Sequence, residues 1–327
     1  MRPFVHDDPD FDDVLRIVAT ERGIGVALIE KDYWVTHTLW ALHKQGFELW
    51  FKGGTSLSKG FGLIKRFSED LDLKIEPGAV TTLSAVANWK SESSKSTSER
   101  GAHFEQLAGL IQVAGASVSL GDAEDPSHRS ANIHITYPGR HHSSLPAVLR
   151  PFVLLEVGNA RVTPFVERDL TSFVHERLAQ TGQLGDFEDN RPRSVRCVHP
   201  LVTLLEKLDA LARRVPREGT EPAVFVRHFE DAAHIIRAAR NLPSLRGYAT
   251  IRALADELHA HKQLKVIPSA TDPVFSPGDS ERWSDVRRAH KDIRPMFWGP
   301  RISIEEACAD IRGWLEVEFG EPPLPRH

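Results

Sequence analysis

Two short stretches decide the fold of this chain: Lys52-Gly53-Gly54-Thr55-Ser56 and, one helix-length later, Ser68-Glu69-Asp70-Leu71-Asp72-Leu73. The paired glycines are typical of a turn whose backbone N–H groups surround phosphate oxygens. Aspartate carboxylates are ligands that hard cations such as Mg²⁺ prefer. A phosphate turn followed by two metal ligands predicts a site that holds a nucleoside triphosphate (NTP) together with Mg²⁺ or Mn²⁺.

The residues around these stretches predict a strand, a turn and a helix. Residues 47–51 are apolar enough for a short buried strand that runs into the glycines, and residues 55–64 have helical spacing. A helix that begins just after the turn has unpaired N–H groups and a positive dipole end at that point. Both features would face whatever occupies the turn.

The two aspartates share one face of a predicted strand. Residues 70–75 alternate between polar and apolar, so Asp70 and Asp72 project to one side, with Ser68 beside them. Neighbouring carboxylates repel each other unless a cation lies between them or one is protonated. The alternative is an ordinary exposed acidic strand. In combination with the glycine turn, however, the pattern resembles the DNA polymerase β-like nucleotidyltransferase superfamily.

That superfamily usually carries a third carboxylate on a neighbouring strand, and Glu156 is the candidate here. It lies in an otherwise apolar stretch, 151–158, where burial of a lone acid is costly without a partner or a metal. We therefore predict Asp70, Asp72 and Glu156 as the metal ligands. The alternative is that Glu156 ends the strand in an ion pair with Arg161.

Composition describes an ordinary globular protein. The chain has 327 residues, of which 41% are hydrophobic and 26% charged, which is enough material for two packed domains. No apolar segment has the length of a membrane span, and the first residues lack the layout of a signal peptide, so we expect a cytoplasmic protein without a membrane partner. Cys197 and Cys308 are far apart and predict neither a disulfide nor a zinc site.

Periodicity predicts an α/β (α+β) domain with a small mixed sheet, followed by a mainly helical C-terminal domain, in a bilobed arrangement. We expect the nucleotidyltransferase domain over 1–196 and the helical domain over 197–327. The serine-rich run 91–98 is expected to be a mobile loop. Further strands are predicted at 117–120, 133–137 and 152–157, and further helices at 12–20, 29–44, 99–113 and 201–214.

Five blocks together resemble the AbiEii/AbiGii family of nucleotidyltransferase toxins, in the family's order. They are Ile29-Glu30-Lys31-Asp32-Tyr33-Trp34-Val35, Phe51-Lys52-Gly53-Gly54-Thr55-Ser56-Leu57-Ser58-Lys59, Arg66-Phe67-Ser68-Glu69-Asp70-Leu71-Asp72, Glu206-Lys207-Leu208-Asp209-Ala210-Leu211 and Arg227-His228-Phe229-Glu230-Asp231. The resemblance implies the toxin half of a toxin–antitoxin or abortive-infection system, with a cognate antitoxin as partner. Some members, of the MenT type, modify the acceptor end of tRNA.

The resemblance also assigns roles to residues of this sequence. It implies phosphate binding by the glycine turn, Gly53, Gly54, Thr55 and Ser56, and Mg²⁺ binding by Asp70 and Asp72. Lys207 corresponds to the second-motif lysine and Asp231 to the third-motif aspartate, on two C-terminal helices that close over the nucleotide. Ser68 corresponds to a serine that contacts phosphate or is modified by an antitoxin. Where relatives often carry a second acid three residues after Asp231, this chain has His234.

The helical residues also have interpretations that do not need the family. In 201–214 three leucines form a buried stripe, which places Lys207 on another face, where it can contact a phosphate as a point charge. The alternative is a surface lysine paired with an acid. For Asp231 the alternative is a salt bridge within its own helix to Arg227, four residues earlier.

Basic residues gather in the second half of the chain. Residues 191–240 carry ten Lys or Arg against six acids, a net of +4. With Lys59 and Lys65, the arginines of this segment are expected to line a groove for an RNA 3′ end, and Lys59 is also a candidate nucleotide ligand. A solvated arginine-rich helix surface is the alternative.

The sequence thus predicts an Mg²⁺-dependent transfer of a nucleoside monophosphate from an NTP to an acceptor hydroxyl, with release of pyrophosphate. The predicted acceptor is the 3′ end of tRNA, and Glu156 or Asp70 takes the hydroxyl proton. Two alternatives remain open: transfer to a protein or small-molecule hydroxyl, and a non-catalytic nucleotide-binding module.

Overall fold

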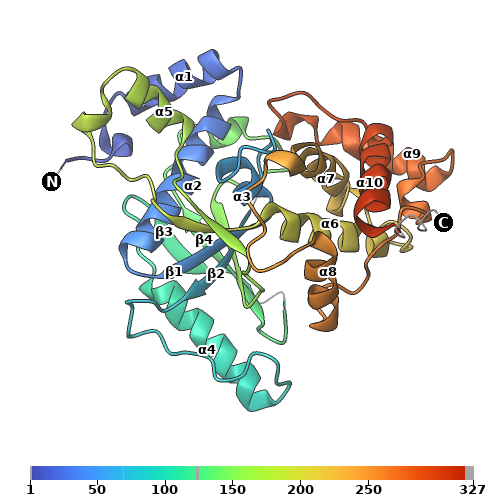
Figure 1. Cartoon of the computed structure of the whole chain (residues 1–327). Helices are drawn as coiled ribbons and strands as arrows, with labels where there is room; N and C mark the ends of the chain where they lie inside the picture. The colour runs from blue at the N-terminus through green and yellow to red at the C-terminus, as the bar shows by residue number, and fades with distance from the viewer. Residues whose placement is uncertain (1, 69, 123–124, 321–327) are drawn as a thin grey trace, which may run out of the picture. The chain divides into compact units, whose positions relative to one another are not determined.

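Residues 2–68, 70–122 and 125–320 are described by the computed structural model of the chain (Figure 1). The chain forms two compact units, one made of Met1–Phe61 and Phe67–Cys197 and the other of Gly62–Arg66 and Val198–His327. The first unit contains the sheet, and the second is helical. An α/β part followed by a mainly helical part confirms the predicted fold class. The limits of independently folding domains stay a prediction.

A mixed sheet is the framework of the first unit. The described strands are β1 (Glu48–Lys52), β2 (Asp70–Glu76), β3 (Ser117–Leu120), β4 (Ser130–Thr136), β5 (Val153–Gly158), β6 (Phe165–Arg168) and β7 (Val195–Val198). They form one seven-stranded sheet in the order β3-β4-β5-β2-β1-β7-β6. β1 is antiparallel to β2 and parallel to β7, whereas β2 is parallel to β5. The strands that carry the predicted metal ligands are therefore neighbours.

The central strands are buried on one face and open on the other. In β2, Leu71 and Leu73 are almost fully buried, whereas Asp70 and Asp72, which alternate with them, are half-buried. Each buried leucine contributes about 1.5–3 kcal/mol. A register shift of one residue would exchange the two faces, so the apolar side chains fix the aspartates on the open face.

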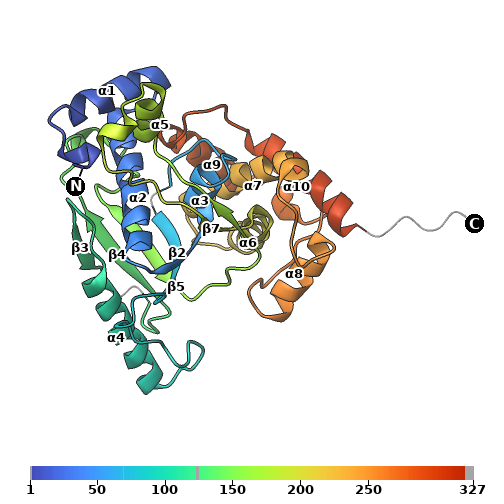
Figure 2. The same ribbon diagram turned by 60° about the vertical axis from the view of Figure 1, so that its left-hand side comes forward.

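Helices complete the first unit: α1 (Phe11–Arg22), α2 (Val26–Lys44), α3 (Gly53–Lys59), α4 (Ser94–Leu110) and α5 (Phe173–Gln180). Both views show α2 lying along the sheet (Figures 1 and 2), where it packs against β1 and β5. α2 is buried on nearly all sides. A helix in this position needs internal partners for its charged side chains.

Two consecutive charged residues of α2 find these partners in the backbone of distant loops. The buried Glu30 carboxylate accepts the N–H groups of residues 140 and 141 at 2.8 and 3.1 Å. Lys31 Nζ donates to the carbonyls of residues 150 and 152 at 2.7 and 2.6 Å. These carbonyls precede β5, so Lys31 anchors the strand that carries Glu156.

The second unit is built from α6 (Pro200–Arg214), α7 (Arg227–Ala238), α8 (Ile251–Ala260), α9 (Glu281–Asp292) and α10 (Ile304–Phe319). α7 packs against both α6 and α10. The predicted stripe of α6, Leu204, Leu208 and Leu211, is fully buried. The segment Gly62–Arg66 joins this unit through a β-bridge between Arg66 and Phe297.

Most elements lie close to their predicted limits. The strand predicted at 117–120 is β3, and the other four predicted strands differ from β1, β2, β4 and β5 by at most a few residues. The helix predicted over 55–64 is shorter, because Gly60 ends α3 and Gly62 has a φ of +63°. β6 and β7, both of four residues, were not predicted.

The serine-rich run is not wholly a loop. α4 begins at Ser94, and the Ser93 side chain accepts the N–H of Ser96 as an N-cap. Serine is among the residues that favour this position, which explains why a run with loop composition starts a helix. In the part of the chain described, no helix combines the length and apolar character that a membrane span requires.

Candidate active site

A turn at Gly53 joins β1 to α3. Gly53 has a φ of +74°, which favours glycine. A Cβ atom at this position would lie 1.9 Å from Oδ2 of Asp72. Position 53 therefore requires glycine for two reasons: the backbone conformation and the close approach of the Asp72 carboxylate.

The first turn of α3 is fixed against the start of β2. Thr55 Oγ1 donates to the carbonyl oxygen of Asp70 at 2.8 Å, and Ser56 is buried. Lys52, the N-cap residue, makes no side-chain cap bond to this turn. Because the first N–H groups of a helix lack partners within it, the amides of Gly53, Gly54 and Thr55 are the donors that this turn can offer to an anion.

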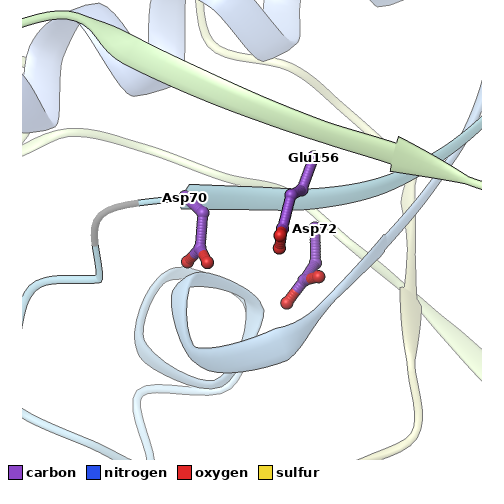
Figure 3. Close-up of side chains that lie close together, drawn as sticks. All are labelled: Asp70, Asp72 and Glu156. Atoms are coloured by element: carbon purple, nitrogen blue, oxygen red, sulfur yellow. The ribbon is translucent and has the colours of Figure 1, made fainter. Parts of the chain in front are cut away.

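Three carboxylates converge beside this turn. Ligand oxygens of Asp70, Asp72 and Glu156 lie within 4.8 Å of one another. The sheet register produces this arrangement, since Asp72 is paired with Glu156 across β2 and β5. Figure 3 shows the three side chains pointing to the same side of their strands. Of the described residues, these form the group with the spacing of a metal site.

The close spacing affects protonation. Partial removal from water, then repulsion from Asp72 and from Asp70, raises the pKa of Glu156 to about 7. Ser68 Oγ donates to Asp70 Oδ1 at 2.8 Å and so orients that carboxylate. Three acids held this closely are stabilised by a cation between them, and oxygen-only ligands suit Mg²⁺ or Mn²⁺. The donor set thus fits a divalent cation.

Lys59, predicted as a nucleotide ligand, has a partner inside the protein. Its Nζ lies 2.5 Å from Oδ1 of Asp32, and both side chains are 8% exposed. The other Asp32 oxygen accepts the N–H of Phe173 at the start of α5, at 2.9 Å. This interaction agrees with a structural role for Asp32. A phosphate contact by Lys59 would require it to leave a buried ion pair.

In the second unit, α6 and α7 bring Lys207 and Asp231 together. Lys207 Nζ donates to Asp231 Oδ2 at 2.8 Å and lies 3.4 Å from Nδ1 of His228. Arg66 completes the cluster with two bonds to the same carboxylate, Nε to Oδ1 at 2.8 Å and Nη2 to Oδ2 at 2.7 Å. The partners of Asp231 are thus Arg66 and Lys207, rather than the predicted alternative Arg227.

This cluster is buried and charged. Burial opposes ionisation, but the Arg66 and Lys207 cations hold the pKa of Asp231 well below its ordinary value. Burial lowers the pKa of Lys207, and Asp231 counteracts this effect. Lys207 is only 7% exposed, so the alternative of a surface lysine is wrong. Asp231 fixes the position of the lysine ammonium group.

The comparisons with known proteins identify the family. A sequence model described as nucleotidyl transferase AbiEii toxin, type IV toxin–antitoxin system, matches residues 39–307. The chain belongs to this family. Among solved structures it resembles MenT4, a nucleotidyltransferase toxin from Mycobacterium tuberculosis H37Rv, with 16% identity, 90% of this chain and 98% of that chain covered, and a TM-score of 0.38. No curated protein matches the chain.

Membership of the AbiEii family confirms the resemblance drawn from the sequence blocks. The protein is a nucleotidyltransferase, and its family is that of toxins from type IV systems, which have an antitoxin partner. The glycine turn, the three carboxylates, Lys207 and Asp231 all lie inside the matched span. Their individual roles stay predictions.

Two features of this AbiEii protein were missed by reasoning from the sequence. Arg66 lies in one of the five blocks that resemble the family, but no role was predicted for it, and its partner Asp231 lies 165 residues away. Glu30 precedes Lys31 and Asp32, and all three are buried. A run of charged residues inside an apolar helix was the available signal that these side chains have internal partners.

Proposed function

We propose that this AbiEii protein transfers a nucleoside monophosphate from an NTP to the 3′-terminal hydroxyl of a tRNA and releases pyrophosphate. The observation that carries the proposal is the convergence of Asp70, Asp72 and Glu156 beside the turn at Gly53. The choice of tRNA is supported by the resemblance to a family in which some members modify the acceptor end of tRNA.

The first unit supplies the groups for the donor nucleotide. Asp70, Asp72 and Glu156 would hold Mg²⁺ or Mn²⁺. A cation bound there supplies charge neutralisation for phosphate oxygens and makes a hydroxyl more acidic. The first-turn amides of α3 would bind phosphate oxygens. Ser68 would join them by turning toward phosphate the hydroxyl that donates to Asp70.

The transfer is an in-line displacement at phosphorus. The acceptor oxygen forms a bond to the α-phosphorus, the bond from this phosphorus to the bridging oxygen breaks, and pyrophosphate leaves with the electron pair. The hydroxyl proton passes to a carboxylate oxygen of Glu156 or Asp70.

Within the second unit itself, Lys207 is the candidate point charge for a phosphate group. In the cluster described above, two of its N–H donors are directed at Asp231 and His228. A lysine ammonium has three donors, so one remains for a ligand. Asp231 acts as a positioning residue for Lys207 in this proposal.

The test is to incubate the protein with each labelled NTP and Mg²⁺, in separate reactions with deacylated tRNA, with a protein fraction and with small molecules. Label on tRNA that disappears in Asp70→Asn and Asp72→Asn, while both variants stay folded by circular dichroism, is the expected result. Label on protein or small molecules alone would overturn the choice of tRNA. Full transfer by Asp70→Asn would overturn the assignment of the site.

A further inference from the structure

A pocket of about 320 Å³ adjoins the carboxylates within the first unit. It has the size of a small-ligand site. The polar side chains that line it are Lys52, Asp72, Arg129, Ser130, Glu156 and Asn159. The pocket therefore combines two of the three carboxylates with two basic and two neutral polar side chains.

The pocket meets the carboxylate group at Asp72 and Glu156. Lys52, which is paired with Asp72 at the end of β1, also lines it, whereas Asp70 and Ser68 do not. The pocket therefore extends from Asp72 and Glu156 toward the end of β5, and Asp70 and Ser68 lie outside it.

The end of β5 leaves room for the pocket because it carries no side chain there. Gly158 follows Glu156 by two residues, so both positions face the same side of the sheet. Gly158 is paired with Ser130 at the start of β4. A Cβ atom added at Gly158 would lie 3.5 Å from the nearest atoms. A side chain can therefore be accommodated there, and a larger one would extend into the pocket.

Charge in the pocket favours a phosphate. Lys52 and Arg129 face Asp72 and Glu156, and a cation bound to the carboxylates would leave the basic side chains in excess. Arg129 Nη2 lies 3.4 Å from Glu92 Oε1 and donates to the carbonyl oxygen of Lys90 at 3.3 Å, and the side chains of Arg129 and Glu92 are 43% and 87% exposed. Such long, exposed contacts contribute little and do not hold the guanidinium away from a ligand.

Building on the proposed function, we infer that this pocket is the acceptor subsite and takes the terminal nucleotide of an RNA, with Arg129 and Lys52 on its phosphate and its free hydroxyl at Glu156. In-line displacement places the attacking hydroxyl opposite the leaving pyrophosphate. If the triphosphate lies beside Asp70 and Ser68, the acceptor approaches from the pocket at Asp72 and Glu156. Ser130 and Asn159 supply hydrogen bonds to the sugar or base of that nucleotide.

Two variants and a matched control test the inference. Arg129→Ala removes the charge, and Gly158→Leu fills the pocket without changing charge. Arg16→Ala is the control, because Arg16 is 60% exposed and makes an ion pair with Asp12 at 2.8 Å, outside the pocket and outside the basic segment 191–240. The measurements are the KM for deacylated tRNA and for NTP, the Kd for tRNA in Mg²⁺ at several salt concentrations, and the Kd for a non-hydrolysable NTP analogue.

We expect Arg129→Ala and Gly158→Leu to raise the KM and Kd for tRNA by about tenfold or more, with NTP binding unchanged. Arg129→Ala should also reduce the slope of log Kd against log salt by about 0.7–0.9, the value of one phosphate contact. Arg16→Ala should change neither quantity. An altered affinity for the NTP analogue with unchanged tRNA affinity would overturn the inference, as would normal values for both pocket variants.

The binding measurements separate this inference from the proposed function. If the wild-type protein binds tRNA but transfers no label to it, the proposed function fails, and the effect of Arg129→Ala on the tRNA Kd and salt slope still decides the inference. If the wild-type protein does not bind tRNA, the inference itself is wrong.

Discussion

Gly53 is the residue on which the carboxylate arrangement most depends. Its positive φ starts α3 directly after β1, and its missing side chain admits Oδ2 of Asp72. The carboxylate is thereby held against the amides that would bind phosphate. A substitution here changes the backbone energy and the position of a proposed metal ligand together.

Gly53→Ala should weaken Mn²⁺ binding by about tenfold or more, the effect of disturbing the support of a metal ligand. The control is Gly182→Ala, which has the same φ of +74° but no atom within 4 Å of an added Cβ. Both variants should lose about 1–2 kcal/mol of stability from the backbone alone. Isothermal titration and thermal unfolding measure the two effects, and equal Mn²⁺ affinity in both variants would contradict the account of Gly53.

The protonation of Glu156 predicts a pH dependence for the metal-free protein. The folded pKa of about 7 lies above the ordinary value of 4.5, so this group favours the folded state below about pH 4.5 and loses that contribution as the pH rises through 7. Glu156 is exposed, so solvent screening limits the effect to about 1 kcal/mol.

The difference in Tm between wild type and Glu156→Gln, measured in EDTA across this range, isolates that contribution. Wild type should lose stability relative to the variant as the pH rises, and Mg²⁺ should restore it. A pH-independent difference would count against crowding of the three acids.

Asp231→Asn should destabilise the protein by about 3–5 kcal/mol, because Arg66 and Lys207 would remain buried without their counter-charge. Asp310→Asn is the control, since its ion pair with Arg237 at 2.7 Å is partly exposed, with side chains 28% and 48% exposed, and contributes at most about 1 kcal/mol. Urea unfolding measures both. Similar losses in the two variants would disprove the structural importance of Asp231, and any loss of transfer in Asp231→Asn has to be judged beside its stability.

At the scale of elements, the sequence predicted β2 best. Alternation in residues 70–75 was sufficient to place both aspartates on one face, and the apolar surroundings of Glu156 singled out that residue. The pairing of Asp72 with Glu156 depends on strand order and register, which a single strand does not encode. The site residues could thus be proposed individually, whereas their convergence required the sheet.

Ion pairs between residues far apart in the sequence could not be predicted from local spacing. Local spacing pointed Asp231 toward Arg227, but the buried carboxylate bonds to Arg66, 165 residues earlier. Likewise Lys59 was expected on phosphate and lies against Asp32 of α2. Helical spacing describes neighbours on one helix, whereas these partners are chosen by tertiary packing.

The Asp32–Lys59 pair ties α2 to the end of α3, so its loss should loosen the glycine turn. Asp32→Ala should destabilise the protein by about 3–5 kcal/mol, because it leaves the buried ammonium group of Lys59 without its counter-charge and an N–H of α5 without its acceptor. The double variant Asp32→Ala/Lys59→Met should recover part of this loss, since no buried charge is left. Urea unfolding measures the stability of the single and double variants. If the double variant is destabilised by the sum of its two single changes, the unpaired buried charge is not the cause of the loss in Asp32→Ala.

At the scale of the whole molecule, two separate segments of the chain form the helical unit. Gly62–Arg66 belongs with Val198–His327, although the sequence between them forms most of the sheet unit. Arg66 supplies the guanidinium for Asp231, and the carbonyl of Lys65 accepts the N–H of Trp298 at 3.0 Å. The predicted domain 197–327 lacks this segment.

A fragment of residues 198–327 should therefore be unstable alone, whereas the same fragment with residues 62–66 joined through a flexible linker should be more stable by several kcal/mol. Arg66→Met in the joined fragment is the control and should remove most of the gain. Circular dichroism during urea unfolding measures all three. A fragment 198–327 that folds as well without the added segment would support the predicted domain boundary and contradict this reasoning.

The central claim is that the carboxylates beside the turn at Gly53 bind a divalent cation. Its most direct test is titration of Mn²⁺ followed by electron paramagnetic resonance, with Mg²⁺ as competitor, for wild type and for Asp70→Asn/Asp72→Asn. We predict saturable binding by wild type that Mg²⁺ displaces and that the double variant loses while it keeps its fold. Equal Mn²⁺ affinity in the two proteins, or no binding by wild type even with NTP present, would contradict the account.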